Sequence, residues 1–573
     1  MKNILFILSL IAGTVTFAQP SWQWAEAINS SQDEKTLDIA TVLASGETYA
    51  CGYFDGNLSA IFTLGLNGTP NMNAPIGVRD GFVAKYNAIG NVVWAFKIGG
   101  AGATVEIEAI TDAPNGNIYV TGEFFNGSVD FQGVVSSISS IRTPTGASKN
   151  MFLAAYSSNG ELLWVTSSTD TGNSIGFGIT ADVNGIYVAG RFAGDITFPP
   201  LAPITWTGIA SYFDAYVTKF DFSGNATDIK TIFSTTGDGH VKAFSLITDG
   251  TGEIYVVGTS GSSGWTYGPV GFNPTDNNNG IAGTDDIWVI KIHESNFNMH
   301  WSQVIGSVEG DIAKGIAYDG TDIYLTGGVG GASINFPGIG AVASIGTAMD
   351  IFTCKLFDAS GLTDWVFLEQ NNSAIDTYGS DIVIDAAGDL YITGTHTDTT
   401  GFNGGLNSIP TIGGLDVFVM SRKNTGAFNW AVSAGGLGND EGFGIGIDNV
   451  GSIYTGGSYD LLSAFGAINL VTDAQNNGFV AKLNLCSLSI VCPANQTVTA
   501  NASCQYTLLD YTVMATPFAS CGIASVTQLP IAGTVVNSGI NPVTVYLTDN
   551  SGNVDSCSFD VIVESAVNPT VVS

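Results

Sequence analysis

Basic residues are scarce in this sequence. Its 573 residues include 17 Lys and Arg against 50 Asp and Glu, which gives a formal net charge of −33 at pH 7. Affinity for nucleic acids and for anionic lipid surfaces depends largely on Lys and Arg side chains. We therefore expect no nucleic acid and no anionic membrane surface among the partners of this protein.

Long apolar runs are missing after the first residues, which excludes a membrane-spanning helix there. At the N-terminus, Lys2 precedes the apolar run Ile4–Ala12, and Thr16-Phe17-Ala18 places small residues at −3 and −1 before Gln19. This arrangement is typical of a secretory signal peptide. We predict a signal peptide over residues 1–18, export without membrane insertion, and a secreted, extracellular or cell-surface location.

The sequence also lacks the common catalytic motifs. It has four histidines, none at metal-ligand spacing, and it has no nucleophile elbow, phosphate loop or His-Glu-x-x-His. These absences favour a non-enzymatic role. A mechanism that uses two carboxylates stays open, because such pairs can assemble from distant parts of a chain.

A repeat accounts for most of the sequence. The segment Gly116-Asn-Ile-Tyr-Val-Thr-Gly122 recurs, and its tyrosine returns every 63 to 70 residues, each time with Gly three positions later. The abundance of glycine (73 residues) and of aromatic residues is typical of many short strands joined by tight turns. The repeated tyrosines are Tyr49, Tyr119, Tyr187, Tyr255, Tyr324, Tyr391 and Tyr454.

Each repeat predicts four short strands, which is one blade of a β-propeller. The third strand begins with Asp or Asn two residues before an aromatic residue, as in Asp80-Gly-Phe82, and the fourth carries a tryptophan such as Trp94. The seventh repeat has no tryptophan strand, but Ser21–Ile28 contains Trp24, 70 residues before Trp94 and in phase with it. We expect this N-terminal strand to complete the seventh blade, because closure removes the exposed sheet edge.

The Asp-x-Phe-Val-x-Lys and Gly-x-x-x-Trp elements resemble the SBBP-type β-propeller repeat of secreted bacterial proteins, over about residues 21–485. The resemblance implies a seven-bladed β-propeller at 19–485 and says little about activity. The tryptophans are interpreted as packing between blades, since a large flat ring there buries much apolar area. The Asp residues that begin the third strands are interpreted as turn and strand-end acceptors.

After Cys486 the pattern changes to alternating strands over about 80 residues, the size of one immunoglobulin-like β-sandwich. Cys492-Pro-Ala-Asn-Gln-Thr-Val498 and Thr548-Asp-Asn-Ser-Gly-Asn553 resemble the hyalin repeat (HYR) module, which implies an Ig-like fold common in adhesive proteins. We predict this sandwich at 486–566, followed by a tail at 567–573. In an exported chain the cysteines predict disulfides with three alternative pairings of four candidates. Cys486 is then a free thiol at the domain junction, or it displaces one of the four. The four candidates are Cys492, Cys504, Cys521 and Cys557.

Cys51 and Cys354 lie inside predicted propeller strands and are expected to be buried thiols. The long connections between second and third strands differ from blade to blade, and variable loops on a rigid scaffold often carry recognition. Their aromatic residues are therefore candidate ligand contacts, whereas a phenylalanine that recurs in each connection is expected to be internal. The candidates are Phe54, Trp206, Trp265 and Tyr267.

The favoured function is a secreted binding or adhesion protein whose propeller recognises a glycan or an extracellular protein. An extracellular lyase or hydrolase of polysaccharides is a second hypothesis, and a structural surface-layer component is a third; fold alone does not separate them. No cofactor is expected, although oxygen-rich turns leave calcium open. The oligomeric state is also open.

Overall fold

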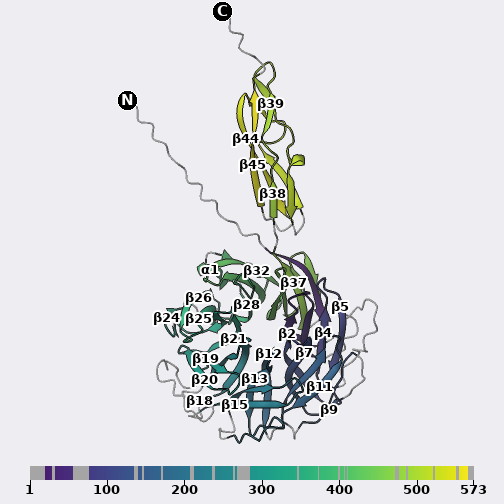
Figure 1. Cartoon of the computed structure of the whole chain (residues 1–573), viewed down its shortest axis with the longest axis vertical. Helices are drawn as coiled ribbons and strands as arrows, with labels where there is room; N and C mark the ends of the chain where they lie inside the picture. The colour runs from purple at the N-terminus through teal and green to yellow at the C-terminus, as the bar shows by residue number, and fades with distance from the viewer. Residues whose placement is uncertain are drawn as a thin grey trace, which may run out of the picture. The chain divides into compact units, whose positions relative to one another are not determined.

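A computed structural model of the chain describes residues 20–565, apart from 29–31, 56–76, 135–139, 145–147, 170–171, 207–211, 235–238, 262–264, 268–283, 345–347, 372, 398–399, 406, 410, 472–475, 486–487, 520–522 and 550–553. The predicted signal peptide and the tail 567–573 lie outside the described residues. The fold is all-β: the helices in the described part are α1 (Phe402–Gly405) and the short 3-10 helix η1 (Thr512–Met514). The chain forms two compact units, one spanning Trp22–Leu483 and one that includes Asn484–Ser573 (Figure 1).

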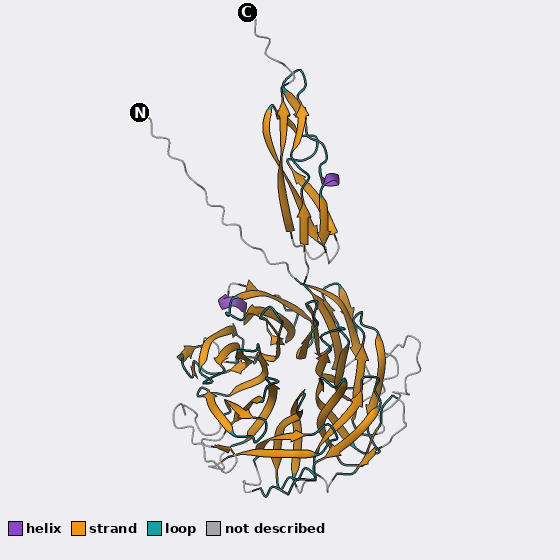
Figure 2. Cartoon of the chain, in the orientation of Figure 1, coloured by secondary structure: helices purple, strands orange, loops and turns teal. Residues whose placement is uncertain are grey.

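The first unit contains, within its described residues, seven sheets with a core of four antiparallel strands (Figure 2). Six sheets take their four core strands in chain order, and the last takes three from the end of the unit and one from its beginning. The strands are β2 (Glu34–Thr41), β3 (Thr48–Phe54), β4 (Asp80–Tyr86) and β5 (Val92–Ile98); β6 (Thr104–Asp112), β7 (Asn117–Phe125), β10 (Asn150–Ser157) and β11 (Leu162–Ser167); β12 (Asn173–Asp182), β13 (Gly185–Ala193), β14 (Asp214–Phe220) and β15 (Ala226–Ser234); β16 (Val241–Thr248), β17 (Glu253–Ser260), β19 (Asp286–His293) and β20 (Met299–Ile305); β21 (Asp311–Tyr318), β22 (Asp322–Val329), β25 (Asp350–Phe357) and β26 (Thr363–Asn371); β27 (Tyr378–Ile384), β28 (Asp389–His396), β31 (Asp416–Lys423) and β32 (Phe428–Gly436); β33 (Glu441–Ile447), β34 (Ser452–Tyr459), β37 (Asn477–Asn484) and β1 (Ser21–Ile28).

The first strand of each sheet is its inner strand, and the seven inner strands are arranged in a ring. Strand β2 contacts β6, and the contacts continue from β6 through β12, β16, β21, β27 and β33 back to β2. The sheets therefore surround a common centre, as in a β-propeller. Strand β1 pairs with β37 at the outer side of the last sheet, which is the position that the in-phase Trp24 predicts.

Short strands in the connections extend or flank these sheets. They fold back over sheet edges, so the connections contribute to the core instead of standing apart from it. They are β8 (Val129–Phe131), β9 (Ser140–Arg142), β18 (Trp265–Tyr267), β23 (Ser333–Phe336), β24 (Gly340–Ala343), β29 (Thr400–Gly401), β30 (Asn407–Ser408), β35 (Ser463–Phe465) and β36 (Ile468–Leu470). The recurring phenylalanines are buried as expected, and Phe272 lies outside the described residues; the buried ones are Phe131, Phe198, Phe336, Phe402 and Phe465.

Tryptophans join neighbouring sheets. The indole of Trp94 on β5 lies against Gly160 of the next sheet, whose φ is +80°, and a Cβ there would come within 3.1 Å of the ring. The indole N–H also donates to the carbonyl of Ser158 at 3.2 Å. Trp24, Trp164, Trp301 and Trp365 make the same two contacts with the sheet that follows each of them. The interpretation of these residues as packing between blades is confirmed.

The second unit has its own core. Its largest sheet has the order β39 (Gln496–Thr499), β45 (Val554–Glu564), β44 (Gly539–Asp549) and β42 (Ile523–Leu529), with β39 parallel to β45. Two strand pairs accompany it, β38 (Leu488–Val491) with β41 (Thr516–Ala519) and β40 (Gln505–Thr507) with β43 (Val535–Asn537). Alternate residues of β44 and β45, such as Val543, Val545 and Val561, are fully buried, because side chains of a strand alternate between its faces.

Candidate functional site

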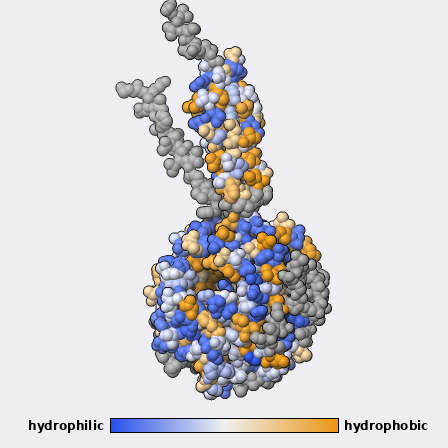
Figure 3. Space-filling model, turned by 45° about the vertical axis from the view of Figure 1, so that its right-hand side comes forward, coloured by the Kyte–Doolittle hydropathy of each residue, from blue (hydrophilic) through white to orange (hydrophobic). Residues whose placement is uncertain are grey.

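A cavity of about 530 Å³ lies at the centre of the first unit. Residues from all seven inner strands line it, so every sheet contributes to its wall. The space-filling view of Figure 3 shows this unit hollowed, with apolar residues visible in the opening. Because the sheets hold the wall on all sides, the cavity is preformed, as ligand sites usually are.

Each inner strand carries a β-bulge at the same place. In β6, for example, Ile107 and Ala109 pair with neighbouring residues of β7, and Glu108 between them has no partner in the ladder. The same shift occurs in β2, β12, β16, β21, β27 and β33. Bulges re-aim side chains and are common beside active sites. The bulge residues all line the cavity and are, in ring order, Leu37, Glu108, Phe177, Phe244, Lys314, Ser380 and Phe443.

The bulge residues vary among the sheets, although three of the seven are Phe, whereas the residues two positions later are similar in every sheet. Two residues after each bulge stands a branched apolar residue, Ile39, Ile110, Ile179, Leu246, Ile316, Ile382 or Ile445. The repeat therefore keeps the scaffold and varies the side chain that faces the cavity. Sequence reasoning missed these positions. An alignment of the first strands of the repeats could have found them. In that alignment the middle residue of one three-residue segment varies between repeats, as in Ile107-Glu-Ala109 and Ala313-Lys-Gly315.

Two opposite charges belong to this ring of bulge residues. Burial, together with Glu123 and Glu106, raises the pKa of Glu108 to about 8, against the opposing effect of Lys149 and Arg191. Burial lowers the pKa of Lys314 to about 8, although Glu441 acts in the other direction. The Lys314 Nζ lies 3.8 Å from the centroid of the Tyr378 ring. Among the described residues, neither Glu108 nor Lys314 has an ion-pair partner within 4.0 Å.

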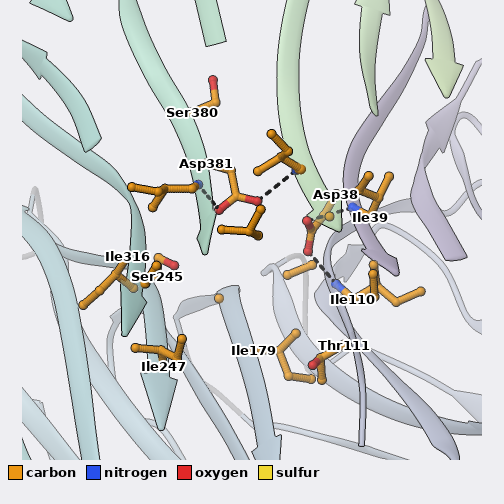
Figure 4. A pocket seen from close by; sticks show the side chains of 18 of the residues that line it. Asp38, Ile39, Ile110, Thr111, Ile179, Ser245, Ile247, Ile316, Ser380 and Asp381 are labelled. Atoms are coloured by element: carbon orange, nitrogen blue, oxygen red, sulfur yellow. Dashed lines mark hydrogen bonds between the residues drawn. The ribbon is translucent and has the colours of Figure 1, made fainter. Parts of the chain in front are cut away.

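Two carboxylates, those of Asp38 and Asp381, also line this cavity (Figure 4). Asp38 accepts hydrogen bonds from the backbone N–H groups of Ile39 (2.8 Å) and Ile110 (2.9 Å). Asp381 accepts the equivalent bonds from Ile382 (2.8 Å) and Ile445 (3.0 Å). Burial raises the pKa of Asp381 to about 7. Burial raises the pKa of Asp38 well above its usual value, and the nearby Asp381 carboxylate adds to this.

Aromatic rings form one side of the wall. The rings of Phe177 and Phe244, from adjacent sheets, have centroids 5.6 Å apart. The Arg191 guanidinium lies 5.3 Å from the Phe177 centroid, and Lys35 Nζ lies 5.2 Å from that of Phe443. The cavity thus combines aromatic faces with ionisable side chains, a lining that suits a ligand with polar ends and an apolar body.

The aromatic residues predicted to face a ligand lie elsewhere. Phe54 ends β3 and is fully buried, and Trp265 and Tyr267 belong to β18, which pairs with β15 and is buried. The prediction is wrong for these three, because the connections fold back and bury their aromatic side chains. Trp206 is half-buried, and its indole N–H donates to Asp214 at 2.6 Å. A role for Trp206 in binding stays a prediction.

The cysteines divide into paired and free. Cys492 and Cys557, two of the four predicted candidates, form a disulfide. Cys504, a predicted disulfide candidate, is instead an exposed free cysteine, while Cys521 and Cys486 lie outside the described residues. Cys51 and Cys354 are buried and unpaired, as predicted.

A second set of recurring aspartates, which lie in the turns between the first and second strands of the sheets, serves the scaffold. Asp319 accepts the N–H groups of Thr321 and Asp322 and the hydroxyl of Tyr324, and Asp385 and Asp448 make equivalent bonds. Within the described ranges, no cluster of three or more His, Cys, Asp or Glu is arranged to hold a metal ion. The described part of the chain also contains no helix with the length and apolarity needed to cross a membrane.

Comparisons with known proteins bear on the fold alone. No protein-family model matches the chain. An uncharacterised WD repeat-containing protein of Acanthamoeba polyphaga mimivirus is 23% identical over 438 residues, which cover 65% of this chain and 30% of that protein. The chain thus matches less than a third of the length of this relative.

Solved structures with some similarity include the Dos1 propeller (9% identity, TM-score 0.36, 81% of this chain and 96% of that one). Others are BamB from Moraxella catarrhalis (11%, 0.31, 82% and 98%) and a quinohemoprotein alcohol dehydrogenase from Comamonas testosteroni (9%, 0.35, 81% and 76%). These similarities are too weak to carry an argument about activity. The propeller-like fold of this chain rests on the ring of inner strands and on the strand order of its sheets.

Proposed function

We propose that this chain is a secreted binding or adhesion protein that recognises a glycan or an extracellular protein through the central cavity of its propeller. In this proposal the first unit is a seven-bladed β-propeller closed by β1, and the second is an Ig-like β-sandwich of the HYR type that acts as a spacer or second contact. The net charge of −33 and the Cys492–Cys557 disulfide agree with an extracellular protein.

The observation that carries the proposal is the set of seven bulge residues. Equivalent positions that serve only the scaffold would carry similar side chains in every sheet, as the branched apolar positions do. At the seven bulges the chain places three Phe and one each of Leu, Glu, Lys and Ser around one cavity. A ring of varied side chains on a repeated frame is suited to recognition, in the same way as variable loops on a rigid scaffold.

The test is a binding screen with a variant that fills the cavity. The full chain is screened against glycan and extracellular-protein arrays beside the variant Leu37→Trp, since Leu37 lines the cavity and is half-buried. The matched control is Leu437→Trp, because Leu437 is 70% exposed and does not line the cavity. We expect Leu37→Trp alone to weaken binding about tenfold or more. Equal binding by both variants would place the ligand elsewhere, and no binding to either array would overturn the proposal.

A second function is favoured by the pair of carboxylates. Asp38 and Asp381 line one cavity with raised pKa values, and glycoside hydrolysis uses one protonated and one ionised carboxyl group. An extracellular polysaccharide hydrolase would release reducing ends from its substrate, and Asp381→Asn would abolish that release. Polysaccharides that stay intact during long incubation with the wild-type chain would exclude this function.

A further inference from the structure

Glu108 and Lys314 stand on different sides of one cavity. Glu108 belongs to β6 and Lys314 to β21, and two inner strands, β12 and β16, separate them on the shorter way around the ring. Both side chains are half-buried and line the cavity. The Glu108 carboxylate and the Lys314 ammonium group are more than 4.0 Å apart, so they do not form an ion pair with each other.

A half-buried charge without a counter-ion is costly. Transfer of an ionised group away from water disfavours its charged form, and nearby opposite charges normally compensate. Lys35 pairs with Glu441 at 2.9 Å and Lys149 pairs with Glu123, whereas Arg191, beside the Phe177 ring, forms no ion pair within 4.0 Å among the described residues. Glu108 and Lys314 feel opposite charges only from beyond ion-pair distance, and a ligand with one charge of each sign would give each of them a direct partner.

The wall between the two charges is aromatic. Phe177 and Phe244 are the bulge residues of β12 and β16, and they lie between Glu108 and Lys314 in ring order. Their rings are 5.6 Å apart and partly exposed to the cavity. An apolar segment between the two charged ends of a ligand would contact these rings.

We propose that the cavity binds a short peptide or peptide-like zwitterion, with its ammonium group at Glu108, its carboxylate at Lys314 and its apolar middle on Phe177 and Phe244. This inference rests on the proposed function, and it selects a peptide chain end over a glycan as the ligand. Most glycans carry no ammonium group and would leave Glu108 without a partner.

The test uses phenylalanine-containing peptides of two to five residues and titration calorimetry of the full chain at pH 7. Each peptide is compared with its N-acetylated form, its C-terminal amide and the doubly blocked form. We expect free-ended peptides of one length to bind best, and each blocked end to weaken binding about tenfold. Ammonium binding also favours ionised Glu108, so binding releases protons, which titrations in buffers of different ionisation enthalpy measure.

Variants assign each end of the peptide to its residue. Glu108→Gln is expected to bind free and N-acetylated peptides equally and to release fewer protons, and Lys314→Met to bind acid and amide equally. Glu161→Gln and Lys230→Met make the same charge changes away from the cavity and should keep the wild-type discrimination. Thermal unfolding checks that each variant is folded.

The outcomes separate this inference from the proposed function. If doubly blocked peptides bind as tightly as free ones, the zwitterion proposal is wrong. The zwitterion proposal is also wrong if no peptide binds but a glycan or a protein does. The proposed function stands in that case, provided that Leu37→Trp weakens the binding of this glycan or protein. If neither peptides nor any array ligand bind, both fail.

Discussion

The carboxylate of Asp38 accepts a hydrogen bond from the backbone N–H of Ile110, 2.9 Å away on the neighbouring sheet. Asp381 forms the same link to Ile445. These two bonds join inner strands side by side at the wall of the cavity. The equivalent residues Ala109, Gly178, Gly315 and Gly444 have no side-chain acceptor, so the link is a local addition to the repeat.

Asp38→Ala is expected to destabilise the first unit by about 1–3 kcal/mol, because the Ile110 N–H loses its acceptor in a partly buried place. Asp38→Asn keeps an acceptor oxygen and should cost less. Urea unfolding of both variants checks this order. An alanine variant as stable as the asparagine variant would show that water replaces the carboxylate without cost.

The stability of the chain is expected to fall as pH rises from about 5 to 8. Burial raises the pKa of Asp286, Asp311, Asp381 and Asp440 to about 7 and contributes to a pKa of about 8 for Glu108. Between the ordinary carboxyl pKa and these values, these five groups bind more protons in the folded than in the unfolded state, and they outnumber His396 and Lys314, whose pKa values burial lowers to about 4 and about 8. The free energy of unfolding therefore decreases with pH in this window.

Thermal unfolding at pH 5, 6, 7 and 8 measures this trend. The midpoint temperature should be highest near pH 5, and the variant Asp381→Asn should have a flatter profile because one of the titrating groups is gone. A midpoint that rises steadily over this range would contradict the expectation.

Gly160→Ala is expected to destabilise the first unit more than Gly116→Ala. Both glycines have a φ near +80°, where an alanine costs about 1–2 kcal/mol. A Cβ at Gly116 meets nothing within 4 Å, whereas at Gly160 it would lie 2.5 Å from Val134 and 3.1 Å from the Trp94 ring. The difference between the two variants in chemical unfolding isolates the packing against Trp94, and we expect about 1 kcal/mol or more.

Loss of the Cys492–Cys557 disulfide is expected to destabilise the second unit and to spare the first. The bridge closes a loop with a sequence separation of 65, for which chain entropy predicts about 4 kcal/mol. The double variant Cys492→Ala/Cys557→Ala should lower one calorimetric transition and leave the other in place. Cys504→Ala serves as the control, because Cys504 is exposed and free. A common shift of both transitions would show that the units unfold together.

Much of the fold could be predicted from the repeat because its landmarks have local causes. Tyr recurs within strands, Gly recurs at turns, and Trp recurs where an indole packs between neighbouring sheets. Trp24 is in phase with Trp94 for this last reason. The candidate site could not be predicted in this way. Whether Glu108 pairs in the ladder or bulges toward the centre depends on the register against β7, which its own sequence does not specify.

By itself, the sequence determined the repeating four-stranded unit, the N-terminal strand in phase with the last repeat, the acidity of the chain and the cysteines of its C-terminal part. Those properties follow from side-chain alternation, turn residues and charge, which act over short distances. Tertiary structure alone decided that Phe54 and Trp265 are buried and that Glu108 and Lys314 line one cavity. The burial of these residues and the environment of each charge arise only when seven sheets meet around a common centre, since each wall residue then depends on neighbours in other repeats of the chain.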